Sequence, residues 1–248
     1  MRILAFESSA KAASAALLTD GVLTAESYQN DGQTHSRTMM KLAEDLLNTC
    51  GLSPAELDFA AWANGPGSFT GVRIGAAAAK GLCWGAELPC IPVSTLEAMA
   101  WNGVNLEGVI CSCMDARRSQ VYNALFRGEN GKIVRLRPDR AISLKELAAD
   151  LQGFSEPIWF VGDGAALAWG YLNETEAQSD VACGVSQRPY RLVAEHLRQQ
   201  RASGVALAAY QAALQGVQAN AGTVTPNYLR LSQAERERLE RDKVQKGD

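Results

Sequence analysis

One segment of the sequence combines small, polar and cationic residues in a way that could bind an anion. Residues 65–75 read Gly-Pro-Gly-Ser-Phe-Thr-Gly-Val-Arg-Ile-Gly and lead into a stretch with helical periodicity. A glycine-rich loop that opens a helix offers backbone N–H groups and the positive end of the helix dipole to an anion. Together with a polar turn near the N-terminus, this loop supplies the candidate anion-facing residues, which are Glu7, Ser8, Gly67, Ser68, Thr70 and Arg73.

The loop differs from a nucleotide-binding P-loop, because it lacks the Gly-Lys-Ser/Thr ending that places a lysine on a phosphate. Arg73 lies in the first predicted turn of the helix and could take that place. A second interpretation is that the glycines serve close packing. Gly71, Gly75 and Ala79 recur every four residues, and such a stripe lets another element approach closely. Packing is favoured over anion binding, because the small residues continue beyond the loop.

The histidines and cysteines form no recognisable metal-binding or catalytic pattern. His35 and His196 lie far apart in the sequence, and each is expected to be satisfied on the surface or at a helix start. Cys111 and Cys113 alternate along a predicted strand and lack the two-residue spacer of a zinc knuckle. The sequence therefore predicts no catalytic residue and no metal ligand.

Length and charge place the chain among ordinary globular proteins. Its 248 residues are 47% hydrophobic and 21% charged, with a formal net charge of -3, which suggests one or two domains and does not indicate nucleic-acid binding. Acidic and basic residues interleave after Tyr228, which favours a solvated helix there. We recognise no signal peptide and no apolar run long enough to cross a bilayer, so a cytoplasmic location with reduced cysteines is expected.

The elements that must position these residues begin with three meandering strands, the last two joined by an Asp20-Gly21 hairpin turn. Ser53 and Ser94 each open a capping box, which predicts a short turn and a helix start, respectively. Apolar alternation and helical periodicity predict the remaining boundaries. The predicted strands of this half are 3–6, 14–18, 22–26, 59–64 and 90–93, and the predicted helices are 36–50, 72–84 and 95–103.

The second half repeats this pattern. Its predicted strands are 108–114, 121–126, 133–137 and 158–161, and its predicted helices begin at Ser143 or cover 165–172 and 203–216. Residues 190–201 could form either a strand or a helix. The repetition predicts an α/β protein of two lobes, 1–103 and 104–248, in which helix 203–216 could pack back across the lobe junction.

In this order, the motifs resemble the TsaB (YeaZ-like) family of tRNA threonylcarbamoyladenosine biosynthesis proteins. The Gly-Pro-Gly-Ser-Phe-Thr-Gly string is the specific feature, and Glu7 departs from the aspartate that is usual in the family. The resemblance implies a duplicated actin/hexokinase-like (ribonuclease H-like) fold. The supporting motifs are Arg2 to Ser9, Thr34-His35-Ser36, Val93 to Leu96, Met114 to Arg117, Val121-Tyr122, Val161 to Gly164 and Pro226 to Arg230.

The resemblance also implies a non-catalytic scaffold that pairs with the catalytic paralogue TsaD, with TsaE as an ATP-hydrolysing partner. TsaD transfers threonylcarbamoyl to N6 of the tRNA adenosine 3′ of the anticodon. Its His-x-x-x-His metal pair corresponds to Thr95 and Met99 here, which are poor ligands. The acidic residues Glu7 and Asp115 lack the glycine that follows them in actin-like ATPases. No cofactor is expected on the isolated chain, although a nucleotide could lie at the shared interface, and contact with tRNA is expected to be indirect.

The predicted docking surface consists of helices 36–50 and 72–84, which could also close a homodimer when TsaD is absent. On this hypothesis, Gly75→Arg weakens docking and leaves the monomer folded. The main alternative is an autonomous actin-like ATPase or sugar kinase, and a third is a metallopeptidase, which would need the missing histidine pair. The predicted partner-binding residues are Met39, Leu42, Ala43, Leu46, Gly71, Gly75, Ala78, Ala79 and Leu82.

Overall fold

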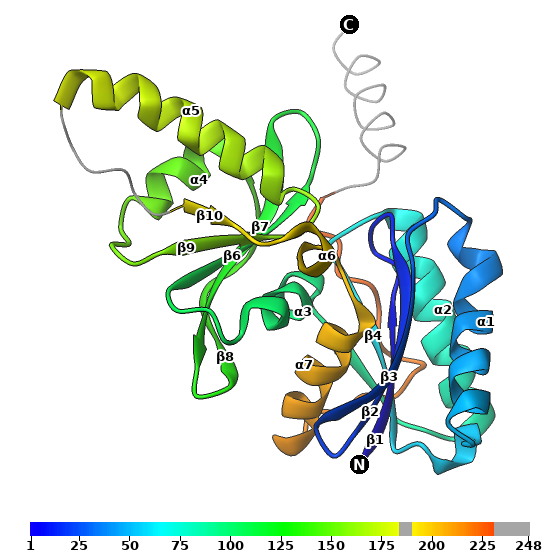
Figure 1. The fold of residues 1–248 in the computed structure, drawn as a ribbon. Helices are drawn as coiled ribbons and strands as arrows, with labels where there is room; N and C mark the ends of the chain where they lie inside the picture. Colours follow the sequence, from blue (N-terminus) through cyan, green and yellow to red (C-terminus); the bar gives the residue numbers. More distant parts are fainter. Residues whose placement is uncertain (184–189, 231–248) are drawn as a thin grey trace, which may run out of the picture.

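Two five-stranded sheets form the framework of the protein, in a computed structural model that describes residues 1–183 and 190–230 (Figure 1). The first sheet has the strand order β3-β2-β1-β4-β5 and the second the order β8-β7-β6-β9-β10. The strands of the first sheet are β1 (Arg2–Glu7), β2 (Ala13–Thr19), β3 (Val22–Gln29), β4 (Phe59–Ala63) and β5 (Cys90–Val93). Those of the second are β6 (Val109–Asp115), β7 (Gln120–Glu129), β8 (Lys132–Ser143), β9 (Ile158–Val161) and β10 (Tyr190–Leu192).

The two sheets are duplicates in topology. In each, three consecutive strands pair antiparallel, and two further strands then add in parallel beside the first of the three. This arrangement confirms the predicted duplicated, two-lobed actin/hexokinase-like fold. In both sheets, the first strand is central, and the turn that follows it lies at the end where the parallel strands also finish.

Strand β1 is buried on both faces of its sheet. Ile3 and Ala5 contact one core, whereas Leu4 and Phe6 contact the other, because successive side chains of a strand point to opposite faces. The near-continuous apolar sequence of this strand is typical of a position covered on both sides.

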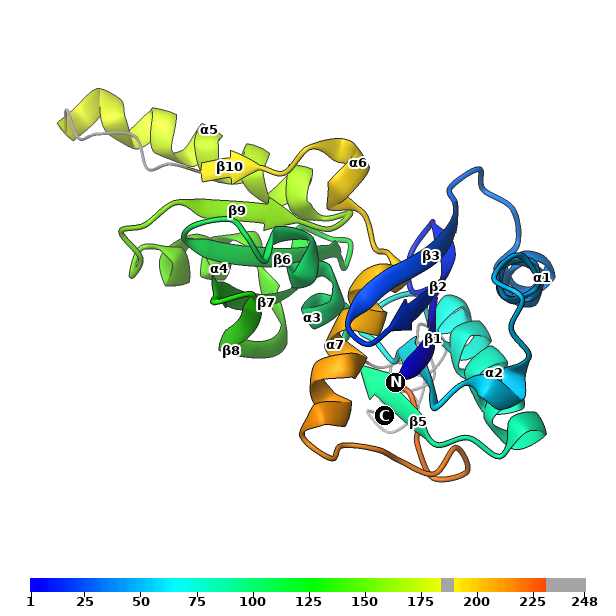
Figure 2. The same ribbon diagram turned by 60° about the horizontal axis from the view of Figure 1, so that its bottom comes forward.

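Helices α1 (His35–Thr49) and α2 (Phe69–Ala86) cover one face of the first sheet, and α7 (Ala202–Leu214) covers the other (Figure 2). The buried residues of α1 recur at helical spacing: Met39, Ala43, Leu46 and Leu47. The hydroxyl of Ser68 accepts a hydrogen bond from the amide of Gly71 and so caps the start of α2.

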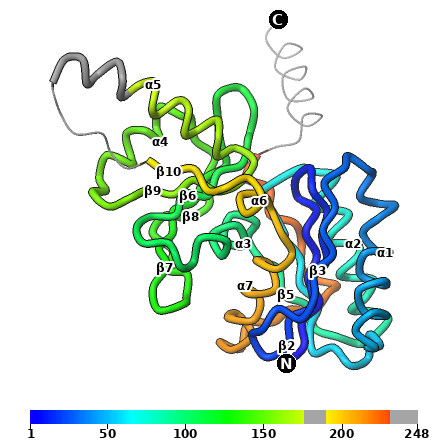
Figure 3. Tube along the Cα trace, in the orientation of Figure 1, coloured from blue at the N-terminus to red at the C-terminus, as the bar shows by residue number. Residues whose placement is uncertain are grey.

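In the second lobe, α4 (Leu144–Leu151) and α5 (Ala165–Cys183) cover one face of the sheet. Ser143 and Glu146 form the predicted capping box at the start of α4. The short helix α3 (Thr95–Ala100) packs on the other face and also against α7. Helix α3 therefore belongs to the contact between the two lobes, as the trace in Figure 3 shows.

The chain returns to the first sheet at its C-terminal end. Helix α7 packs against β1, β2, β4 and β5, and Ala219 then forms an antiparallel bridge with Cys90 of the edge strand β5. Residues 202–230 thus pack with the first sheet, although they follow the second sheet in sequence. A boundary at residue 103 separates the strands of the two sheets. As a division of the whole chain into two lobes, it stays a prediction.

Most predicted elements agree with the structure to within a few residues, and the differences lie mainly in the second half. Strand β8 continues to Ser143, and α5 continues to Cys183, well beyond their predicted ends. The undecided stretch 190–201 contains both β10 and the short helix α6 (Glu195–Arg198). The helix predicted after Tyr228 lies mainly outside the described residues. None of the helices in the described ranges is both long and apolar enough to cross a membrane.

Candidate functional site

The turn that follows β1 is buried, although it is made of polar residues. Glu7, Ser8 and Ser9 are at most 2% exposed. One carboxylate oxygen of Glu7 accepts a hydrogen bond from the Ser9 amide at 2.6 Å, and the other has no hydrogen-bond partner among the described residues. Burial raises the pKa of Glu7 to about 7, against the opposing effect of the Ser9 hydrogen bonds.

The glycine-rich loop packs directly over this turn. A Cβ atom added to Gly67 would lie 2.5 Å from the Ser9 carbonyl oxygen, and one added to Gly71 would lie 2.0 Å from that of Ser8. The Ser68 amide donates to the Ser9 carbonyl at 2.7 Å, and the Ser8 hydroxyl donates to the Gly71 carbonyl at 2.9 Å. These contacts favour the packing interpretation of the glycines, because polar groups that an anion would need are already used within the chain.

The C-terminal segment lies against the outer side of the same loop. The ring of Tyr228 stacks on that of Phe69, with centroids 4.4 Å apart, and the Arg73 Nε donates to the Tyr228 hydroxyl at 2.8 Å. The amide of Asn227 donates to the carbonyl of Asn64 at 2.7 Å. Arg73, the predicted substitute for a phosphate-binding lysine, is therefore held in place by the C-terminal segment.

The equivalent turn of the second lobe, which follows β6, is exposed. Arg117, Arg118 and Ser119 have φ angles of 62°, 55° and 56°, a left-handed conformation that is uncommon for residues other than glycine. The Arg117 amide donates to a carboxylate oxygen of Asp115 at 2.7 Å, which holds the turn in this shape. Arg230 reaches the turn from the C-terminal segment and donates to the Ala116 carbonyl at 2.9 Å.

Carboxylates at the ends of β1, β6 and β9 lie close enough to influence one another. Asp163 follows β9 and accepts a hydrogen bond from the Gln200 amide nitrogen at 2.7 Å. Asp163 is exposed as a residue, but the surrounding protein desolvates its carboxylate, which raises the pKa of that group. The charge of Asp115 raises this pKa further. Asp163 in turn contributes to the raised pKa of Glu7. The described residues contain no group of three or more histidine, cysteine or acidic side chains placed to hold a metal ion.

Comparison with known proteins resolves the identity of this arrangement. The model of the TsaD family, described as tRNA N6-adenosine threonylcarbamoyltransferase, matches residues 25–238. A Bacillus subtilis protein named tRNA threonylcarbamoyladenosine biosynthesis protein TsaB is 32% identical over 98% of this chain and 100% of its own length. The chain belongs to the TsaB family. The protein of the same name from Escherichia coli is 42% identical over 53% of this chain and 58% of its own length.

A solved TsaB-family structure supports the fold. YeaZ from Pseudomonas aeruginosa superposes with a TM-score of 0.75 at 25% identity, covering 92% of this chain and 99% of that chain. The match extends over both lobes, so the duplicated fold described above is that of the TsaB family.

The predicted TsaB-type docking residues lie on α1 and α2, but most of them contribute to the core of the single chain. Seven are buried, while Leu42 and Leu82 are half-buried: the buried ones are Met39, Ala43, Leu46, Gly71, Gly75, Ala78 and Ala79. A Cβ added to Gly75 would lie 2.8 Å from the Ser8 hydroxyl. Gly75 is buried and faces Ser8, so we expect Gly75→Arg to perturb the fold of the monomer as well as any docking.

What α1 and α2 leave accessible is an apolar groove between them, with a volume of about 380 Å³. Met40, which is 50% exposed, lies at its rim, and Leu82 contributes from α2. The groove floor includes Leu4 and Phe6 of β1. For the predicted docking surface, sequence periodicity selected the inward stripe of α1 and not the neighbouring Met40.

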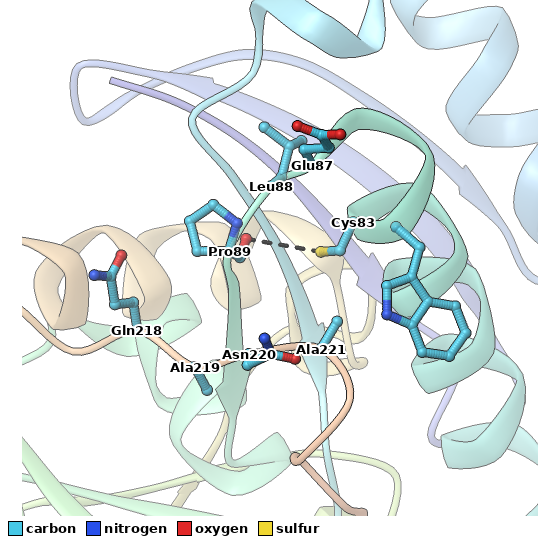
Figure 4. A pocket seen from close by; sticks show the side chains of 9 residues that line it. Cys83, Glu87, Leu88, Pro89, Gln218, Ala219, Asn220 and Ala221 are labelled. Atoms are coloured by element: carbon cyan, nitrogen blue, oxygen red, sulfur yellow. Dashed lines mark hydrogen bonds between the residues drawn. The ribbon is translucent and has the colours of Figure 1, made fainter.

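A second hollow of about 490 Å³ lies where the end of α2 meets the C-terminal segment (Figure 4). The Cys83 thiol, which points toward it, donates to the Pro89 carbonyl at 3.7 Å. Burial raises the pKa of Cys83 to about 12, so the thiol stays protonated at neutral pH and is a poor nucleophile. Residues 218–221 form the opposite wall, beside the bridge between Ala219 and Cys90. This hollow therefore has a structural origin in the covering of edge strand β5.

The remaining predicted positions have structural contacts. His35 begins α1, and its Nε2 lies 2.8 Å from the Ala10 carbonyl oxygen, which ties the helix to the turn between β1 and β2. Cys111 and Cys113 share one face of β6, with their sulfur atoms 3.6 Å apart. Tyr228 and Arg230 belong to a family motif in the sequence, but no local pattern indicates their contacts. Their contacts with Phe69 and Ala116 join positions more than 100 residues apart, which local periodicity does not indicate.

Proposed function

We propose that this chain is a non-catalytic scaffold subunit for threonylcarbamoyl transfer to N6 of the tRNA adenosine 3′ of the anticodon. In this proposal it pairs with a TsaD-like catalytic subunit and works with a TsaE-like ATPase. The observation that carries the proposal is the full-length match to TsaB combined with an accessible apolar groove between α1 and α2. A groove of this kind, with an exposed methionine at its rim, suits the apolar face of a partner helix.

The environment of the inherited chemical positions supports a non-catalytic role. Thr95 and Met99, which correspond to the metal-binding histidines of TsaD, are 0% and 1% exposed and pack within α3 at the lobe contact. Glu7 lies under the glycine-rich loop, and the carboxylates nearby would repel a polyphosphate that arrives without a metal. We propose no cofactor for the isolated chain, and any nucleotide would be held jointly with a partner.

The alternative, an autonomous actin-like ATPase or sugar kinase, makes the opposite prediction for the isolated chain. It requires that the purified chain alone binds Mg-ATP and turns it over. A reconstituted assay with this chain, a TsaD-like subunit, a TsaE-like subunit, ATP and unmodified tRNA separates the two functions when each component is omitted in turn. The scaffold predicts loss of transfer without this chain and no ATP turnover by this chain alone. ATP turnover by the isolated chain, or transfer in its absence, would contradict the scaffold.

The docking surface can be tested with one substitution and one matched control. Met40→Arg places a charge at the groove rim, where burial against a partner would be costly, and we expect at least a tenfold loss of affinity for the TsaD-like subunit. Leu167→Arg changes an equally exposed apolar residue, 42% exposed, on α5 of the other lobe. Isothermal titration calorimetry should show weakened binding only for Met40→Arg. Equal affinities for both variants would move the interface away from α1 and α2.

A further inference from the structure

The arginines of this protein fall into two groups with different surroundings. One group forms ion pairs with carboxylates, as Arg135 does with Glu97 and Arg140 does with Asp150. A second group of arginines forms no ion pair: among the residues that the structure describes, no carboxylate lies within 4.0 Å of their guanidinium groups. This group contains Arg37 and Arg191, on α1 and β10, and a set of four, Arg73, Arg117, Arg118 and Arg230.

These four arginines come from three distant segments, and the C-terminal segment brings them together. Tyr228 receives the hydrogen bond from Arg73 of α2, and Arg230, two residues later, donates to Ala116 in the turn after β6. Arg117 and Arg118 follow Ala116 directly and are exposed. Residues 226–230 therefore span from one lobe to the other, where the orange-red end of the described chain rises between them in Figure 1.

Aromatic rings lie between the arginines. The Arg73 guanidinium carbon is 5.7 Å from the centroid of Phe69 and 5.6 Å from that of Tyr228, and the corresponding carbon of Arg230 is 5.8 Å from that of Tyr122. Planar guanidinium groups bind phosphates through paired N–H donors. Phe69 and Tyr228 stack on each other and hold Arg73, so the rings position the arginines for contacts with an RNA backbone.

We propose that this cationic–aromatic surface, formed by Arg73, Arg117, Arg118 and Arg230 with Phe69, Tyr122 and Tyr228, binds the phosphate backbone of RNA. The choice of tRNA as that RNA rests on the proposed function, whereas the surface itself rests on its charge and rings. Asp115 is the nearest acid of the turn, but its carboxylate accepts the Arg117 amide, and the turn keeps a net positive charge. The net charge of the whole chain conceals this surface, because its arginines lie far apart in sequence.

The direct test is binding of a labelled, unmodified tRNA transcript to the full chain, measured by fluorescence anisotropy across a salt series. Four phosphate contacts predict a slope of log affinity against log salt between about -2.8, the value for single strands, and about -3.6, the value for a duplex. Arg117→Gln/Arg118→Gln should reduce the magnitude of this slope by about 2 and weaken binding at least tenfold at low salt. Lys132→Gln/Lys145→Gln removes the same charge from exposed positions elsewhere on the second lobe and should leave binding nearly unchanged.

Three results would overturn the inference. The wild-type chain could fail to bind tRNA at about 50 mM salt, or both double variants could lose the same affinity, which would indicate general electrostatics. ATP at about 1 mM could displace the tRNA completely, which would make the surface a nucleotide site. Failure of this inference is distinguishable from failure of the proposed function, because the arginine variant should still bind the TsaD-like subunit, whereas Met40→Arg should not.

Discussion

The turns after the central strands β1 and β6 occupy equivalent places in the two lobes, yet one is sealed and the other is open. Glu7 to Ser9 lie beneath the loop that follows β4, and the glycines of that loop touch their carbonyl groups. The corresponding connection after β9 is only Gly162-Asp163-Gly164, and its glycines contact Cys113 and Met114, before the turn begins. Residues 117–119 are therefore left exposed.

The difference lies in the connection after the fourth strand of each sheet. In both lobes, this connection decides how much of the central turn remains accessible. The longer loop of the first lobe makes the turn part of the core. The shorter one of the second lobe leaves a turn whose arginines can meet a partner.

Substitution of Gly71 by alanine is the most severe way to break the sealed turn. The added Cβ would lie 2.0 Å from a backbone carbonyl oxygen of Ser8, so the loop or the turn must move. We expect the free energy of unfolding to fall by about 3–4 kcal/mol, as for an overpacked site where only backbone can give way. Urea denaturation followed by circular dichroism measures this change.

Gly81→Ala provides the matched control on the same helix. No atom lies within 4 Å of the position that its Cβ would occupy, and alanine is the better helix former. The control should stabilise the protein by about 0.5–1 kcal/mol. If both substitutions had similar effects, the glycines of the loop would not be required for the seal.

Replacement of Glu7 by glutamine tests the burial of the first turn through the pH dependence of the free energy of unfolding. Its pKa is raised from 4.5 to about 7 in the folded state, so the folded chain holds a proton that the unfolded chain has released between these values. The free energy of unfolding should therefore fall as the pH rises from 4.5 to about 7, by up to about 3 kcal/mol from this group. Glu7→Gln cannot ionise and should lose that fall.

The measurement is the unfolding free energy of wild type and Glu7→Gln at several pH values between 4 and 8. We expect Glu7→Gln to exceed the wild type above pH 7 by about 1–2 kcal/mol. A parallel pH profile for wild type and Glu7→Gln would show that Glu7 is hydrated and that the turn is not sealed.

Sequence patterns predicted the elements of both turns but not the difference between them. The apolar run of β1 and the Ser143 capping box depend on neighbours within a few residues, and these predictions agree with the structure. The burial of Glu7 depends on contact with residues 67–71, some 60 positions later. The arginine surface depends on Tyr228 and Arg230, whose contacts span 155 and 114 residues. Charge counted along the chain could not indicate a surface that forms only when three segments meet.

The smallest expected effect concerns the backbone of the open turn. Ser119 has a φ of 56°, where an L-residue other than glycine is strained, and its carbonyl accepts the amide of Leu144, a contact that glycine would retain. Ser119→Gly should therefore stabilise the protein by about 1 kcal/mol, because relief of the left-handed strain exceeds the added entropy of the unfolded chain.

Ser155→Gly is the control at an exposed serine outside the left-handed region, and it should lower the stability by about 0.5 kcal/mol. Denaturation midpoints of the two variants should thus move in opposite directions. A loss of stability in Ser119→Gly would mean that its side chain holds the turn. The left-handed backbone would then be supported locally, and the open turn would be as firmly built as the sealed one.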